Sequence, residues 1–256
     1  RRMQTVVTGM VLFAAPNGES DKRVVILTKE RGKITAFARG ARRPNSSLLA
    51  ATNPFAFGTF SVYEGKTAYT LVQAQITNYF RELTSSLEEA YYGFYFLELA
   101  GYYGQENADE TQLLKLLYQS LRALMNSHLD NRLVRAVFEL KALVIQGEYP
   151  QMFECVSCRK REKLIRLVFE RNGMICEDCY KENMNGVFLK DSVLYTFQYV
   201  IAAPPEKLYT FTLTEETLID FQKIMKKLCR QYQDRNFKSL EVLEEMSSLQ
   251  GKYLNV

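Results

Sequence analysis

The hydrophobic pattern of the chain changes its period once, close to residue 84, and this change constrains the fold more than any other feature. Before it, segments rich in β-branched residues alternate with Gly, Pro and Asn turns, which is typical of short strands. After it, apolar residues recur three and four positions apart, which is typical of helices. The sequence therefore predicts an α+β protein in which an all-β module precedes a helical body.

The first module has five segments of strand character and no segment with a helical period. Residues 33–39 show the pattern well, because Ile34, Ala36 and Ala38 fall on one side of a strand and Phe37 on the other. A small closed or nearly closed barrel is the expected arrangement, since closure removes exposed strand edges. The expected strands are 4–13, 23–28, 33–39, 59–63 and 67–76.

The second part reads as a series of helices separated by Gly and Pro. Ser85-Ser86-Leu87-Glu88 has the form of a capping box and predicts a helix start. No apolar run reaches the length of a membrane span, and no secretory signal opens the sequence, so we expect a cytoplasmic protein without a membrane partner. The expected helices cover about 85–101, 109–124, 131–146, 190–202, 215–233 and a last segment from 240.

Two cysteine pairs give the most specific local signal. Cys155-Val-Ser-Cys158 is followed by 17 residues and then by Cys176-Glu-Asp-Cys179. Two such knuckles match a structural zinc site, in which four thiolates surround one ion. Two reduced thiol pairs without metal are the alternative. Residues 164–170 predict a strand that returns the second knuckle to the first, and Cys229 fits an ordinary helical position.

Positive charge is concentrated in the first module. Residues 1–80 hold eleven Lys and Arg against four Asp and Glu, a net charge of +7, whereas the rest of the chain has a net charge of −3. Arg1 and Arg2 precede Met3, which we interpret as the natural start, and without them the module keeps +5. This asymmetry indicates an anionic partner for the module.

Three arginines, Arg39, Arg42 and Arg43, lie where a strand ends and a loop rich in Gly, Pro, Asn and Ser begins. The planar guanidinium donates two hydrogen bonds to one phosphate, so the cluster suits a nucleic-acid backbone. A solvated basic loop is the alternative. Among the aromatic residues, Phe37 is the best candidate for stacking on bases, because it shares a strand face with Lys33 and Arg39.

The chain offers little for catalysis. It has a single histidine, His128, and no Walker loop, no GxGxxG motif and no acidic metal-binding cluster. A four-sulfur site leaves no open coordination position for substrate. We therefore expect a protein that is not an enzyme.

The order of these parts resembles the RecO family of bacterial DNA repair and recombination mediators. The resemblance is carried by Gly18-Glu-Ser-Asp-Lys-Arg-Val-Val-Ile-Leu-Thr28, by residues 32–44 from Gly32-Lys-Ile-Thr to Arg42-Arg43-Pro44, by Tyr63-Glu-Gly65, and by the two cysteine knuckles after Phe138-Glu-Leu140. It covers nearly the whole chain, most specifically residues 9–80 and 135–180.

The resemblance implies an OB fold for the barrel, then an all-helical domain with an inserted four-cysteine zinc finger that holds one structural zinc ion. It further implies binding of single- and double-stranded DNA, strand annealing and recombinase loading with RecR, and contact with the C-terminal tail of single-stranded DNA-binding protein. By motif, Arg39, Arg42 and Arg43 are expected to contact phosphate, together with Lys33 and Arg23. The expected domains are 1–80, 81–150, 151–182 (the zinc finger) and 183–256.

One further interpretation of the same sequence is left open. The chain could be a protein adaptor that recruits RecR and single-stranded DNA-binding protein without being the main DNA contact.

Overall fold

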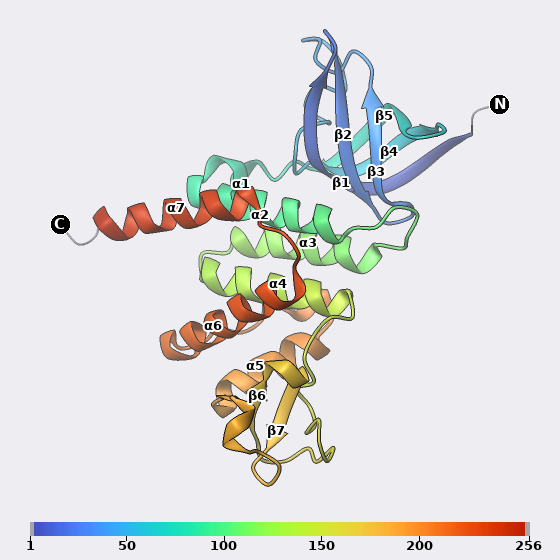
Figure 1. Cartoon of the computed structure of the whole chain (residues 1–256). Helices are drawn as coiled ribbons and strands as arrows, with labels where there is room; N and C mark the ends of the chain where they lie inside the picture. The colour runs from blue at the N-terminus through green and yellow to red at the C-terminus, as the bar shows by residue number, and fades with distance from the viewer. Residues whose placement is uncertain (1–2, 254–256) are drawn as a thin grey trace. The chain divides into compact units, whose positions relative to one another are not determined.

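The computed structural model describes the backbone of residues 3–253 and the side chains as far as Gly251, so Arg1 and Arg2 lie outside the described residues. Contacts divide the chain into two compact units (Figure 1). The first runs to Asn126 and includes the residues from Phe237 onward, and the second is Ser127–Asn236.

Five strands close into a barrel in the order β1-β2-β3-β5-β4, which confirms the closed all-β module. All neighbours are antiparallel except β3 and β5, which run parallel where they close the barrel. The strands are β1 (Gln4–Asn17), β2 (Asp21–Thr28), β3 (Gly32–Ala38), β4 (Phe57–Glu64) and β5 (Tyr69–Asn78).

The barrel interior is filled by alternate residues of each strand. Ile34, Ala36 and Ala38 of β3 are buried as their alternation predicts, and they meet Val24 of β2 and Phe60 of β4 in one apolar core. The interior is therefore a packed core without a channel, and any ligand must bind the outer surface.

The long first strand joins both sides of the barrel. Its first half pairs with β4, and its second half pairs with β2. Gly9 lies opposite Gly58 in this ladder, and a Cβ at Gly58 would lie 2.0 Å from the Gln75 carbonyl oxygen. Glycine is required there because neighbouring backbone occupies the space of a side chain.

A register shift between Val11 and Phe13 marks a β-bulge in the same strand. Strict alternation from buried Val7 and Val11 would turn Phe13 into the core. The bulge reverses this alternation, and Phe13 is 48% exposed on the outer surface.

The segment 39–56 between β3 and β4, which we call the arginine loop, has no strand or helix but is well packed. Leu48, Ala51 and Phe55 are buried, and consecutive turns carry backbone hydrogen bonds along the loop. Phe55 takes a left-handed φ of 75° as the chain enters β4. Loops of this length that remain ordered are commonly functional.

Four helices complete the first unit: α1 (Arg81–Ser85), α2 (Leu87–Tyr103), α3 (Thr111–Leu124) and α7 (Lys238–Tyr253). The sequence analysis did not predict α1. Ser86 ends α1 and begins α2 in an extended conformation, and its side chain makes no capping hydrogen bond. The predicted helix start is therefore correct in place, whereas the capping box is not formed.

The second unit combines three helices with a small sheet of order β7-β6-β8. Asp130 caps α4 and Thr214 caps α6, each by accepting a hydrogen bond from a backbone N–H. The predicted strand 164–170 ends earlier, at Val168, and a short 3₁₀ turn follows it. The elements are α4 (Asn131–Ile145), β6 (Leu164–Val168), β7 (Gly173–Cys176), β8 (Val187–Phe188), α5 (Asp191–Ala202) and α6 (Glu215–Tyr232), with 3₁₀ turns at Phe169–Arg171, Glu182–Met184 and Pro205–Lys207.

Among the residues that the structure describes, none of the helices has the length and apolar character needed to cross a membrane.

Candidate nucleic-acid interface and metal centre

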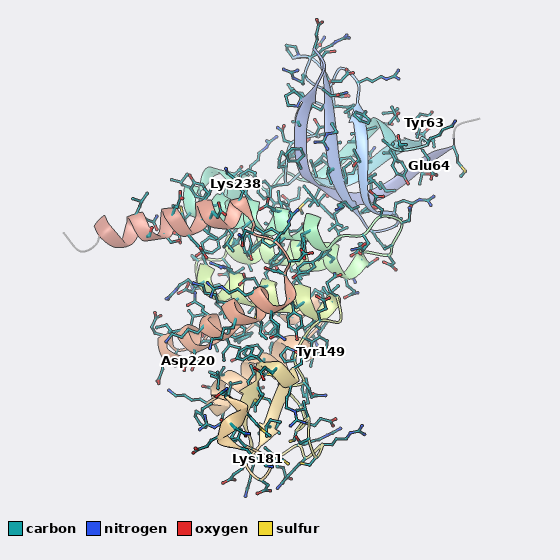
Figure 2. All side chains as sticks on the ribbon, viewed as in Figure 1. Tyr63, Glu64, Tyr149, Lys181, Asp220 and Lys238 are labelled. Carbon is teal, nitrogen blue, oxygen red and sulfur yellow. The ribbon has the colours of Figure 1, made fainter. Side chains whose placement is uncertain are left out.

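A row of aromatic and basic side chains crosses the outer surface of the barrel. Arg23 of β2 lies opposite Phe37 of β3 in the ladder, and its guanidinium carbon is 5.4 Å from the ring centroid of Phe13 on β1. We call Phe13, Arg23 and Phe37 the stacking row. The ladder continues from Phe37 through Thr70 to Tyr63, which Figure 2 labels at the end of β4.

Two of the predicted phosphate contacts, Arg39 and Arg43, lie at the end of β3 and in the first turn of the arginine loop. Both side chains are exposed. Neither guanidinium forms an ion pair or hydrogen bond with any residue from 3 to 251. They present positive charge to solvent directly beyond Phe37.

Arg42 is exposed as well, but one end of its side chain is held by backbone. Its Nη1 donates to the carbonyl oxygens of Gly18 at 3.0 Å and Glu19 at 3.2 Å, both in the β1–β2 turn. Its other guanidinium nitrogens remain available to an anion. Arg42 therefore joins the arginine loop to the turn beside it.

Lys33 is placed apart from the other predicted contacts. It is the second residue of β3, about 20 Å along the chain from Arg39 at roughly 3.3 Å per residue. Its Nζ donates to the carbonyl oxygen of Gly101 in α2 at 2.7 Å. The structure thus gathers Arg23, Phe37, Arg39, Arg42 and Arg43 and leaves Lys33 with the helices.

Two residues of this surface escape sequence reasoning. Phe13 faces outward only because of the β-bulge, which alternation cannot reveal. Lys22 reads as one more surface cation, yet its ammonium is turned into the base of the arginine loop. The Asp-Lys-Arg run that begins β2 offers no signal for this.

The four predicted metal ligands come together in the second unit. The sulfur atoms of Cys155, Cys158, Cys176 and Cys179 all lie within 4.8 Å of one another, and those of Cys158 and Cys176 are 3.7 Å apart. Tetrahedral zinc with Zn–S bonds of about 2.3 Å requires sulfur atoms about 3.8 Å apart. The cluster therefore fits a metal ion held by four thiolates.

Local backbone geometry forms the two knuckles. The N–H of Cys176 donates to the sulfur of Cys155, and Arg159 donates its N–H to the Cys155 carbonyl at 2.8 Å. Arg159 takes a left-handed φ of 64°, which closes this tight turn. The second knuckle closes in the same way, because Tyr180 donates its N–H to the Cys176 carbonyl at 3.1 Å.

The electrostatics of the cluster favour a cation at its centre. Burial raises the pKa of Cys155, but N–H groups of Cys176, Cys158 and Ser157 donate to its sulfur and bring the pKa down to about 6. Conversely, the side chains of Cys158 and Cys176 raise the pKa of Cys179. A divalent ion offsets the repulsion that opposes four adjacent thiolates.

Around these cysteines, the polar side chains face outward. Lys160 pairs with Asp178 at 3.1 Å, and Lys163 with Glu177 at 3.8 Å, which links the two knuckles. Lys181 follows the second knuckle and is exposed (Figure 2). The cysteine module (residues 155–188) is thus a closed cluster with a charged exterior.

A groove of about 320 Å³ runs along α6 in the second unit. Phe169, Val187 and Ile224 contribute its apolar lining. Four exposed cations surround this lining, and the Nζ of one of them, Lys227, lies 5.5 Å from the Phe169 ring centroid. The cations are Lys223, Lys226, Lys227 and Arg230. The groove fits an apolar chain that carries negative charge.

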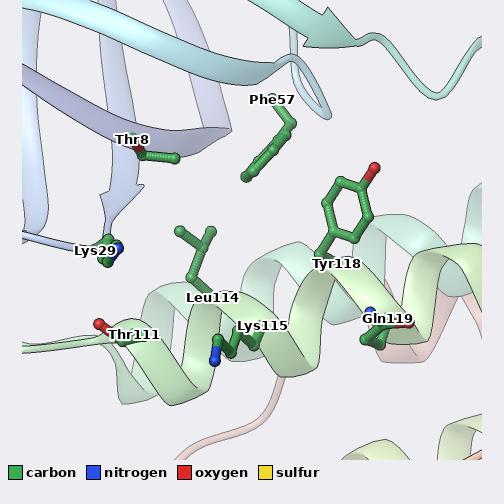
Figure 3. Close-up of a pocket in the computed structure, with 8 residues that line it drawn as sticks. All are labelled: Thr8, Lys29, Phe57, Thr111, Leu114, Lys115, Tyr118 and Gln119. Carbon is green, nitrogen blue, oxygen red and sulfur yellow. The ribbon is translucent and has the colours of Figure 1, made fainter. Parts of the chain in front are cut away.

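A smaller cavity of about 230 Å³ lies between the barrel and α3, within the first unit (Figure 3). Thr8 and Phe57 line it from the barrel, and Leu114 and Tyr118 line it from α3. The Phe57 and Tyr118 rings pack with centroids 4.7 Å apart. This contact joins the barrel to the helices that follow it.

Comparison with known proteins gives matches along almost the whole chain. Residues 3–80 match the family described as "Recombination protein O N terminal", and residues 84–241 match "Recombination protein O C terminal". Relatives include the DNA repair protein RecO of Halalkalibacterium halodurans, 29% identical over 241 residues and 94% of both chains. RecO of Bacillus subtilis is 28% identical over 247 residues, which are 96% of both chains.

Proposed function

The chain belongs to the RecO family of DNA repair proteins, and from this premise we propose that it is a non-enzymatic, DNA-binding recombination mediator. In this role it binds single- and double-stranded DNA through the barrel and promotes annealing of complementary strands. With RecR as partner it helps to load recombinase. It acts in the cytoplasm, where it associates with the nucleoid.

One observation carries the proposal: Arg39 and Arg43 stand exposed and without acidic partners among the described residues, next to the stacking row, in which Phe13 is exposed and Phe37 is half-buried. Guanidinium groups suit phosphates, and the rings of Phe13 and Phe37 suit unstacked bases. Both features lie on the outer surface of one barrel, so a single strand can use them together.

The mechanism is electrostatic. Cations that neutralise phosphates release counterions, and binding therefore weakens steeply with salt. Phosphate contacts carry no sequence information, so the same surface accepts any strand. Annealing follows from the same physics, because a protein that lowers the repulsion between two strands favours their pairing whatever their sequence.

We expect the double substitution Arg39→Ala and Arg43→Ala to weaken binding of a single-stranded oligonucleotide by a similar factor for every sequence. Each lost phosphate contact lowers the slope of log K against log salt by about 0.7, so the double variant should lose about 1.4. Fluorescence anisotropy titrations at several salt concentrations measure both quantities. Lys29→Ala, in the β2–β3 turn, is the matched control and should leave the slope as it is.

Unchanged affinity and slope in the double variant would remove this surface from the DNA site. The adaptor function would then be favoured, in which RecR or another subunit holds the DNA. A gel shift with this chain alone separates the two functions, since an adaptor would not retard the oligonucleotide.

The donor set of four thiolates in the cysteine module supports one structural zinc ion per chain, because soft sulfur ligands in tetrahedral geometry select zinc. Cys155, Cys158, Cys176 and Cys179 would hold the ion. The protein then occupies all four coordination positions of the tetrahedral ion. Zinc would therefore stabilise the fold and would not take part in a reaction.

We expect elemental analysis of the reduced protein to find about one zinc per chain. Removing zinc with a chelator should speed hydrogen exchange of the backbone amides in residues 155–179 and leave the barrel amides protected, because metal binding stabilises only the module around it. Cys229→Ala, on α6 and outside the cluster, should keep the zinc. Less than about half an equivalent in wild-type protein would contradict the assignment.

The basic groove along α6 is our proposed site for the C-terminal tail of single-stranded DNA-binding protein. The resemblance to the RecO family implies that this tail is acidic, and this groove combines an apolar lining with the cations Lys223, Lys226, Lys227 and Arg230. Acidic side chains would meet these cations while an apolar residue fills the groove between them.

We expect Lys227→Glu combined with Arg230→Glu to weaken binding of a synthetic tail peptide about tenfold or more, because attraction is replaced by repulsion at two positions. Fluorescence anisotropy with a labelled peptide measures the change. Lys238→Glu on α7, an exposed site labelled in Figure 2, is the charge-reversal control outside the groove, and it changes the net charge by half as much as the double variant. Equal weakening in the double variant and in Lys238→Glu would place the tail elsewhere.

A further inference from the structure

Besides the Arg42 side chain and a pair of backbone hydrogen bonds that join Phe55 and Ala56 to Val11 of β1, three attachments hold the arginine loop to the segment that ends the β1–β2 turn and begins β2. Asp21 accepts a hydrogen bond from the Gly40 N–H at 2.7 Å, and Arg42 donates its N–H to the Ser20 carbonyl at 2.9 Å. The third attachment, at Lys22, reaches the far part of the loop. Together they tie both ends of the loop to one strand.

The Lys22 ammonium is fully used by this attachment. Its Nζ donates to the Leu49 carbonyl at 3.0 Å, the Thr52 hydroxyl at 2.9 Å and the Asn53 side-chain oxygen at 3.1 Å. An ammonium has three N–H donors, and three acceptors satisfy them all. Lys22 therefore has no donor left for a phosphate, although it lies next to Arg23 in the sequence.

From this geometry we infer that Lys22 is a positioning residue, which holds the arginine loop against β2 so that Arg39 and Arg43 are already in place when a phosphate backbone arrives. The inference rests on the proposed function, since it concerns the same DNA-binding surface. By this inference, some basic residues of the barrel contact the polyanion, whereas Lys22 holds the loop that carries them.

Charge and burial agree with this role. Burial, followed by the repulsion of nearby Arg42, lowers the pKa of Lys22. Thr52, which accepts from Lys22, is itself buried and donates to the Leu48 carbonyl at 2.6 Å. Lys22 thus completes a hydrogen-bonded network at the base of the loop. A lysine that served as a phosphate contact would instead keep its ammonium in water.

Holding the loop in advance affects affinity through entropy. A loop that must be ordered during binding costs about 0.5–1.5 kcal/mol for each side chain immobilised, which corresponds to about two- to twelvefold in affinity. The number of phosphates neutralised stays the same, so the salt slope does not change. These two quantities distinguish a positioning residue from a contacting one.

The test compares Lys22→Met with Arg39→Met in the full chain, with an oligo-dT strand as probe. Lys22→Met should lower affinity about two- to twelvefold with an unchanged salt slope and faster amide exchange in residues 40–53 of the DNA-free protein. Arg39→Met should lower the slope by about 0.7 and leave amide exchange in the loop as in wild type.

Asn53→Ala provides a second variant that changes no charge and lies at an exposed position, so it tests the inference even where Lys22→Met does not fold. It removes one acceptor of Lys22 and should also speed exchange in the loop without altering the slope. A fall in slope of about 0.7 in Lys22→Met, or loop exchange as slow as wild type in Asn53→Ala, would overturn the inference. If Arg39→Met leaves both affinity and slope unchanged, the proposed DNA site itself is wrong.

Discussion

The pairing of β1 with two different strands is the interaction on which the rest of the molecule depends. One strand of 14 residues forms ladders with β4 and with β2, so the sheet closes on itself and has no exposed edge there. Closure forces close backbone approach at Gly9 and Gly58, and it brings the end of β3 beside the β1–β2 turn. The arginine loop is fastened at that junction.

Closure also determines the surface that remains for ligands. With the interior filled by Val24, Ile26, Ile34 and Phe60, only the outer side chains can meet a partner. The bulge in β1 then adds Phe13 to that surface beside Arg23. The cations and rings of this outer surface result from how the barrel is closed, and our proposal places DNA binding on it.

Sequence periodicity was sufficient for the architecture because each strand and helix has one buried face. The strand containing Ile34, Ala36 and Ala38 and the helices that begin after Asp130 and Thr214 all follow from local pattern and capping residues. Two cysteine pairs were likewise sufficient to locate the cluster of four cysteines that could hold a metal ion, since ligand spacing is a local property. The short helix α1 was not predicted, because five residues are too few to show a helical period.

Side-chain partners could not be predicted in the same way, because they depend on contacts between distant segments. Nothing near Lys22 in the sequence shows that its ammonium meets Leu49, Thr52 and Asn53. Lys33 shares a strand face with Phe37, yet its partner is the Gly101 carbonyl of a helix 68 residues away. A count of charges treats these lysines like the exposed arginines. Only the fold shows that their ammonium groups bind internal acceptors.

Hydrogen exchange of the full chain with and without an oligo-dT strand tests the central claim most directly. If the closed barrel presents the DNA-binding surface, bound DNA should slow exchange in residues 13–23 and 37–43 and leave α4, α5 and α6 as in the unbound protein. Protection confined to residues 127–236, with the barrel unaffected, would contradict the account.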